Sequence, residues 1–248
     1  MSDWNDHFTA VSADYRRWRP GYPRALFDYL ASAAPGRDLA WDCATGNGQA
    51  ATLLGELFTR VVATDASAAQ IANAAAHPRV EYRVARAESC PLGDASCDLV
   101  TVAQAVHWFD IDAFWREVRR VLRPGAVVAV WGYGLAFVGP GIDEAIAEFS
   151  IATVGPYWPP ERAIVDSAYA GVSFPFEQLT PPAFSMTAQW SLDHMLAYIA
   201  TWSSVEGYRQ QTGDDPMPAL AKKLAGVWGE PGGRREISWP LILKVGRV

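Results

Sequence analysis

The chain has 248 residues, of which half are hydrophobic and 19% are charged, and its formal net charge is −6. This balance is typical of a globular protein with a substantial core, and it excludes disordered, collagen-like and coiled-coil classes. The acidic charge argues against a nucleic-acid-binding surface. No apolar run reaches the roughly 18 residues of a membrane span. We therefore expect neither a nucleic acid nor a membrane as a partner. The first residues show no secretory signal, and we expect a cytoplasmic protein.

The first segment in chain order, residues 1–36, combines an arm rich in arginine and aromatic residues with a helix. The helix is entered at Pro23, a residue favoured at the first helical position, and a Pro-Gly pair closes it. Leu26, Phe27 and Leu30 recur at helical spacing, so we expect them to form its buried side.

Residues 37–134 alternate short apolar runs with helical patterns, which is typical of βαβ units in a parallel sheet. The expected strands cover residues 39–44, 60–64, 80–85, 98–103 and 126–131. The expected helices are one with Leu53, Leu54, Leu57 and Phe58 on one face, one over 67–76 and one over 111–122.

Residues 135–230 lack this rhythm and mix proline-rich turns with helical patterns. They contain eleven acidic and four basic residues, so the acidity of the chain is concentrated there. A last strand over 237–245, within the terminal segment 231–248, is expected to return to the sheet. We therefore predict one domain in which residues 135–230 form an insertion over the sheet edge.

The most informative segment is the strand-turn-helix over residues 42–48. Gly46 and Gly48 permit positive φ angles in a tight turn and let a ligand approach the backbone. Asp65 ends the next strand, 17 residues after Gly48, where a carboxylate can accept hydrogen bonds from two ribose hydroxyls. The sequence therefore predicts a nucleoside ligand at the carboxyl ends of a parallel sheet.

The residues around these glycines narrow the class of ligand. A dinucleotide fingerprint would place a third glycine where Ala51 stands, and no GxxxxGK[ST] phosphate loop occurs. Asp42, just before the turn, would repel a pyrophosphate but would suit the ammonium group of a methionine moiety. The cysteines at 43, 90 and 97 form no CxxC pair, so we expect no disulfide scaffold and no metal site.

Further motifs stand at the other expected strand ends. They are Asp42-x-x-Thr45-Gly46-x-Gly48, Val62-Ala63-Thr64-Asp65-Ala66-Ser67, Arg86-Ala87-Glu88-Ser89-Cys90-Pro91-Leu92, Asp98-Leu99-Val100 and Leu122-Arg123-Pro124-Gly125. In this order and spacing they resemble the class I S-adenosylmethionine-dependent methyltransferases of the methyltransferase type 11 kind. The resemblance implies a doubly wound α/β fold with a seven-stranded, mostly parallel sheet in the order 3-2-1-4-5-7-6.

Two flanking segments carry a closer resemblance. Phe8-x4-Ala13-x-Tyr15-x2-Trp18-Arg19-Pro20-x-Tyr22-Pro23 and Gln104-Ala105-x-His107-Trp108-Phe109-Asp110 resemble the trans-aconitate-methyltransferase-like subgroup. The cofactor-binding residues that the motifs and the resemblance predict are Tyr15, Arg19, Asp42, Thr45, Gly46, Gly48, Asp65, Ala66, Ala87, Glu88 and Gln104.

The resemblance also implies roles for these residues. Asp65 would hold the ribose, Ala87 and Glu88 would lie beside adenine, and Gln104 would face the methionine end. The arm would close over the cofactor through Tyr15 and Arg19. Structural alternatives remain open, because an acid such as Asp65 can also be a helix N-cap and Glu88 a solvated loop acid. Where the family has an acid before Ala87 this chain has Arg86, so adenine recognition would fall to Glu88 or the backbone.

His107 is the candidate catalytic residue. It follows the fourth strand, where the methyl donor would face the acceptor, and a neutral imidazole could take a proton near pH 7. The same histidine, next to Trp108 and Phe109, could instead make a structural hydrogen bond. Methyl transfer is an in-line displacement that positioning can accelerate, so no dedicated base is obligatory.

The predicted activity is transfer of a methyl group from S-adenosylmethionine to a small molecule, leaving S-adenosylhomocysteine. O-methylation of a carboxylate or hydroxyl is the favoured reaction, with a neutral or weakly anionic acceptor because the insertion is acidic. The alternative is a catalytically inactive S-adenosylmethionine-binding sensor or partner subunit. We expect a monomer or a homodimer.

Overall fold

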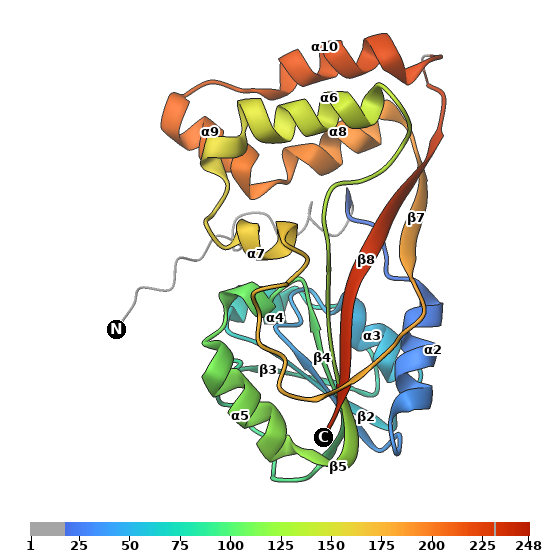
Figure 1. Ribbon diagram of the computed structural model, residues 1–248, viewed down its shortest axis with the longest axis vertical. Helices are drawn as coiled ribbons and strands as arrows, with labels where there is room; N and C mark the ends of the chain where they lie inside the picture. The colour runs from blue at the N-terminus through green and yellow to red at the C-terminus, as the bar shows by residue number, and fades with distance from the viewer. Residues whose placement is uncertain (1–17, 231) are drawn as a thin grey trace.

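The computed structural model describes residues 18–230 and 232–248, and the predicted cofactor residue Tyr15 lies outside them. Figure 1 shows a sheet with helices against it, and a group of helices beyond the ends of its strands. None of the helices in the described part of the chain is both long enough and apolar enough to cross a membrane.

The sheet follows the strand order β3-β2-β1-β4-β5-β8-β6, and β7 pairs with β8 outside this path. The strands are β1 (Leu39–Cys43), β2 (Arg60–Asp65), β3 (Val80–Val84), β4 (Cys97–Ala103), β5 (Leu122–Tyr133), β6 (Glu177–Leu179), β7 (Ser185–Trp190) and β8 (Arg235–Arg247). Strands β1 to β5 pair in parallel, while β8 runs antiparallel to β5, β6 and β7. The expected fold class and strand order are confirmed, with β7 as an additional strand.

The burial of each strand follows from its place in the sheet. In the interior strands β1, β2 and β4 consecutive residues are buried, since a parallel sheet covered on both faces needs continuous apolar runs. The edge strand β3 is only partly buried. One face packs against α5 (Ile111–Val121), and the other against α2 (Arg24–Ala33) and α3 (Gln49–Gly55).

Two helices are shorter than the sequence predicts. Helix α3 ends at Gly55, yet Leu54 and Phe58 are fully buried because a last turn continues the same face. Helix α4 covers only Ala68–Ala72 instead of residues 67–76. The N–H of Ala75 donates to the carbonyl of Asn47 in the glycine loop (3.0 Å), and this tertiary hydrogen bond replaces a further helical turn.

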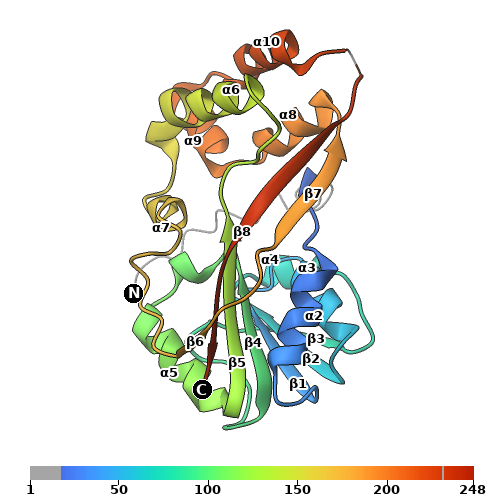
Figure 2. The same ribbon diagram turned by 45° about the vertical axis from the view of Figure 1, so that its right-hand side comes forward.

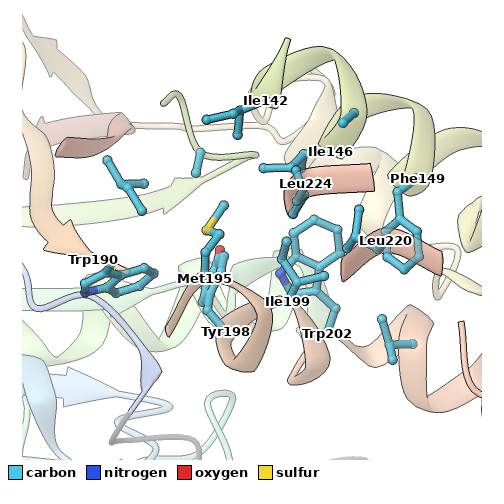
Figure 3. Close-up of a cluster of buried hydrophobic side chains, with 14 of the residues drawn as sticks. Ile142, Ile146, Phe149, Trp190, Met195, Tyr198, Ile199, Trp202, Leu220 and Leu224 are labelled. Carbon is cyan, nitrogen blue, oxygen red and sulfur yellow. The ribbon is translucent and has the colours of Figure 1, made fainter. Parts of the chain in front are cut away.

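Residues 135–230 form most of a second layer, which we call the helical layer. It contains α6 (Ile142–Glu148), α8 (Leu192–Ala200), α9 (Ser203–Thr212) and α10 (Met217–Trp228). Figure 2 shows that the β7–β8 ribbon rises from the sheet towards this layer and that α7 (Arg162–Asp166) lies between the two. The core of the helical layer is rich in aromatic side chains, including buried Trp190 and Trp202 (Figure 3).

Candidate active site

The carboxyl ends of the parallel strands bring most of the predicted residues to one edge of the sheet. The turn after β1 leads from Asp42 to Gly48, which is the N-cap of α3. Asp65 ends β2, and Gln104 follows β4 directly. In parallel sheets ligands bind at this edge.

The glycine turn has the backbone that its sequence predicts. Gly46 and Gly48 have φ angles of 55° and 85°, in the left-handed region that favours glycine. A Cβ atom on Gly48 would collide with the Tyr82 hydroxyl, whereas one on Gly46 would meet no heavy atom within 4 Å. The turn is therefore packed below Gly48 and open above Gly46, as a ligand-binding turn requires.

Asp42 lies beneath this turn and organises it. Asp42 is only 1% exposed, and its carboxylate accepts hydrogen bonds from the hydroxyls of Thr45 (2.5 Å) and Thr101 (2.7 Å). Burial raises the pKa of Asp42 to about 6, against the opposing effect of the two threonine hydroxyls. The predicted contact of Asp42 with a methionine ammonium stays a prediction.

Asp65 ties the glycine turn to the end of β2. Its carboxylate accepts the N–H groups of Gly46 and Ser67, each at 2.9 Å. Asp65 is partly exposed and its neighbour Ala66 is exposed. An anchored, accessible carboxylate is what a ribose diol needs, so these residues fit the nucleoside of S-adenosylmethionine.

The loop after β3 carries Ala87 and Glu88, the two residues predicted to lie beside adenine. Ala87 is buried, and the Glu88 carboxylate accepts the Asp110 N–H (3.1 Å) and pairs with Arg86 (3.2 Å). Glu88 therefore joins this loop to the start of α5, and its contact with adenine stays a prediction. A shallow pocket of about 400 Å³ adjoins the loop and is lined by Val84, Ala85, Arg86, Ser89, Cys90 and Pro91.

Gln104 and Arg19 both donate hydrogen bonds to Tyr133, at the end of β5. Gln104 has a φ angle of 57°, an unusual conformation for a residue with a side chain and a frequent one at functional sites. Its Nε2 donates to the Tyr133 carbonyl (3.1 Å), while Arg19 Nη1 donates to the Tyr133 hydroxyl (3.2 Å). The Arg19 guanidinium also lies 5.2 Å from the ring centre of Tyr198, on α8. Sequence patterns had indicated neither tyrosine.

His107 lies in a short helical turn (Val106–Trp108) after β4. Burial, together with the positive charge of Arg162, lowers its pKa to about 4, so the imidazole is neutral at pH 7. Within residues 18–230 and 232–248 its Nδ1 has no hydrogen-bond partner. The ring of Tyr169 faces it, with centroids 6.5 Å apart and planes at 29°. Tyr169 belongs to no local motif, so the sequence did not indicate it.

The structure thus connects the predicted residues in two groups. One group consists of Asp42, Thr45, Gly46, Gly48, Asp65 and Ala66 around the glycine turn, and the other of Arg19 and Gln104 on Tyr133. Ala87 and Glu88 lie in a separate loop against α5. No group of three or more potential ligands placed to hold a metal ion occurs among the described residues.

Comparison with known proteins agrees with this architecture. The methyltransferase domain family matches residues 41–130, from β1 into β5. A Dictyostelium discoideum protein named a methyltransferase is 33% identical over 225 residues, which are 89% of this chain and 86% of that protein. The chain belongs to the class I S-adenosylmethionine-dependent methyltransferases. Its membership of the trans-aconitate-methyltransferase-like subgroup stays a prediction.

Two further relatives of this methyltransferase show how far the similarity extends. A Mycobacterium tuberculosis methyltransferase is 40% identical over 131 residues, about half of each chain. A solved structure described as a type II methyltransferase from Anaeromyxobacter dehalogenans is 45% identical and covers 92% of this chain and 97% of its own, with a TM-score of 0.87. The whole architecture, helical layer included, is therefore shared with a known structure.

Proposed function

We propose that this methyltransferase methylates a small molecule, at an oxygen atom of a carboxylate or hydroxyl group. The observation that carries the proposal is the burial of His107 and Tyr169, beside which the acceptor would lie. His107 is half-buried and Tyr169 fully buried, and α7 and the helical layer lie beyond the strand ends. A covered site with aromatic and neutral polar groups suits a small molecule better than a protein or nucleic-acid chain.

The residues of the chain bind and orient the two reactants. When bound, S-adenosylmethionine supplies a methyl group on a positively charged sulfur. Asp65 would hold the ribose beside the open face of Gly46, and Gln104 would lie at the methionine end. The surrounding side chains would exclude water and hold the acceptor in line, which is how such a displacement is accelerated.

His107 would contribute little as a strong base. An imidazole with a pKa of about 4 is neutral at pH 7, and its Nδ1 could accept a hydrogen bond from a protonated acceptor. A carboxylate or phenolate carries no proton at its reacting oxygen, so transfer to it needs no base. We further propose that the enzyme acts as a monomer or homodimer without a nucleic-acid or membrane partner.

Calorimetry and a product assay test this proposal. S-adenosylmethionine should bind to the purified protein, and release of S-adenosylhomocysteine should follow with at least one of a panel of small carboxylic acids and phenols. Binding without release from any member of the panel would favour an inactive binding protein. Absence of binding at millimolar ligand would contradict both functions.

A further inference from the structure

A tight turn after α7 presents Tyr169 to the interior. Ala168 and Tyr169 have φ angles of 54° and 57°, so two consecutive residues with side chains adopt the left-handed conformation. Lys244 on β8 stabilises the turn, because its Nζ donates to the carbonyls of Tyr169 (2.7 Å) and Val172 (3.2 Å). Strain that the surrounding structure holds in place is common where a side chain is positioned for function.

The Tyr169 hydroxyl lies at the carboxyl ends of β4 and β5. Tyr169 is 0% exposed, and its hydroxyl has no hydrogen-bond partner in the described part of the chain. A Cβ atom on Gly132 would collide with this hydroxyl and would lie 2.8 Å from Gln104 Oε1. Burial of an unpaired hydroxyl costs free energy, and a ligand that accepts its hydrogen bond would recover it.

One cationic side chain, Arg162, acts on this hydroxyl and on His107. Arg162 lies close enough for its charge to lower the pKa of His107, beside the larger effect of burial. Burial raises the pKa of Tyr169, and the charge of Arg162 opposes the rise. Arg162 is itself oriented by Asp166 (2.8 Å) and by the Trp158 ring, whose centre lies 4.5 Å from its Cζ.

We propose that the Tyr169 hydroxyl binds the methyl acceptor by donating a hydrogen bond to an anionic oxygen, so that the enzyme favours carboxylates and phenolates. The inference rests on the proposed function. One lone pair of an acceptor oxygen forms the bond to the methyl carbon as the carbon–sulfur bond breaks. The electron pair of that bond stays on sulfur, so the anionic acceptor becomes a neutral ester or ether and no proton has to leave.

The net charge of residues 135–230 had pointed towards a neutral or weakly anionic acceptor. A count of charges does not show where they lie. The side chains of Glu148 and Asp166 are 65% and 57% exposed, whereas Arg162 is 20% exposed and near His107. The regional total therefore does not by itself describe the surroundings of Tyr169, on which the partly buried Arg162 acts, because partly buried charges are screened least.

Tyr169→Phe tests the inference, because it removes the hydroxyl and keeps the ring. The probe is 4-hydroxybenzoate, which carries a carboxylate and a phenol, titrated into the S-adenosylhomocysteine complex of the full chain. We expect about 10-fold weaker binding of the probe and of any acceptor that turns over. Affinity for S-adenosylhomocysteine should not change, and the melting temperature should stay equal or rise, since an unpaired buried hydroxyl is lost.

Two further variants make the result specific. Tyr29→Phe alters a partly buried tyrosine on α2 that packs against Phe184, and it should leave probe binding unchanged. Gly132→Ala should displace the Tyr169 hydroxyl and weaken probe binding, and its S-adenosylhomocysteine affinity is measured as well because the same Cβ would lie 2.8 Å from Gln104 Oε1.

The outcomes separate the inference from the function on which it rests. Equal probe affinity in wild type and Tyr169→Phe would overturn the role of the hydroxyl. Failure of the wild-type complex to bind the probe would overturn the acceptor class, while S-adenosylmethionine-dependent transfer would stand. Failure of the wild type to bind S-adenosylmethionine would overturn the proposed function itself.

Discussion

The predicted cofactor end and the proposed acceptor end of this methyltransferase are built in different ways. At the cofactor end, Thr45 and Asp42 are three residues apart, and Asp65 anchors Gly46 from the adjacent strand. At the acceptor end, Tyr169 lies beside Gly132 and is held by Lys244, both distant in the sequence. The cofactor end is therefore formed by residues at neighbouring strand ends, whereas the acceptor end depends on the packing of segments that are distant in the sequence.

The family model matches residues 41–130, which hold the predicted cofactor end, and stops before α7 and the helical layer, whereas the Dictyostelium discoideum relative is similar over 89% of this chain. We expect substitutions in the helical layer to alter acceptor selection while the glycine turn and Asp65 remain unchanged. The following predictions test this separation.

The largest effects are expected from cavities in the two cores. Leu99→Ala, in β4, and Leu224→Ala, in α10, each remove a fully buried side chain and should lower the free energy of unfolding by about 2–5 kcal/mol. At a temperature where both variants are folded, Leu224→Ala should keep its S-adenosylhomocysteine affinity within about threefold while acceptor turnover falls. Urea unfolding and calorimetry measure the two quantities. An equal loss of S-adenosylhomocysteine affinity in Leu99→Ala and Leu224→Ala would show that the helical layer is not independent of the cofactor end.

Asp65→Ala should break the cofactor end. The carboxylate aligns Gly46 and is predicted to bind the ribose, so its loss should weaken S-adenosylhomocysteine binding by about 100-fold, or about 3 kcal/mol. Asp143 is the matched control, since its Oδ1 also accepts two N–H groups, those of Val138 (2.7 Å) and Gly139 (3.1 Å). Asp143→Ala should destabilise the helical layer without changing cofactor affinity in calorimetry. A normal affinity in Asp65→Ala would refute the assignment.

Asp42 should make stability depend on pH. Its pKa of about 6 exceeds the ordinary value of 3.8, so the folded protein binds this proton more tightly than the unfolded chain. The contribution is present below pH 4 and is lost as the pH rises through 6, which should lower the free energy of unfolding by about 3 kcal/mol. Asp42→Asn cannot titrate and should show a flatter profile in urea unfolding between pH 4 and 7. Parallel profiles would contradict the raised pKa.

The smallest effect is expected on the surface of the helical layer. Lys223 on α10 and Glu148 at the end of α6 form an ion pair whose side chains are 46% and 65% exposed. Lys223→Ala should cost about 0.5 kcal/mol or less, and this difference should vanish in 1 M salt. Urea unfolding at low and high salt measures it, and turnover should not change. A cost comparable to that of Leu224→Ala would mean that this pair holds the layer together.

The sequence predicted the elements of the sheet better than their ends. The strands appear where apolar runs occur, because burial on both faces of a parallel sheet requires such runs. The helix predicted over 67–76 stops at Ala72, because Ala75 bonds to Asn47 across the glycine turn. Glu88 pairs with Arg86 and the start of α5, which depends on a rotamer and a packing contact that no spacing rule encodes.

The sequence by itself determined the alternating sheet, the glycine turn and the acid at the end of β2. These features depend on hydrophobic period and on short spacings, so neighbouring residues and adjacent strands specify them. The tertiary structure alone decided the arrangement of the proposed acceptor end, by placing Tyr169 against Gly132 and Arg162 near His107. These residues are far apart in the chain, and only the folding of residues 135–230 onto the strand ends brings their side chains together.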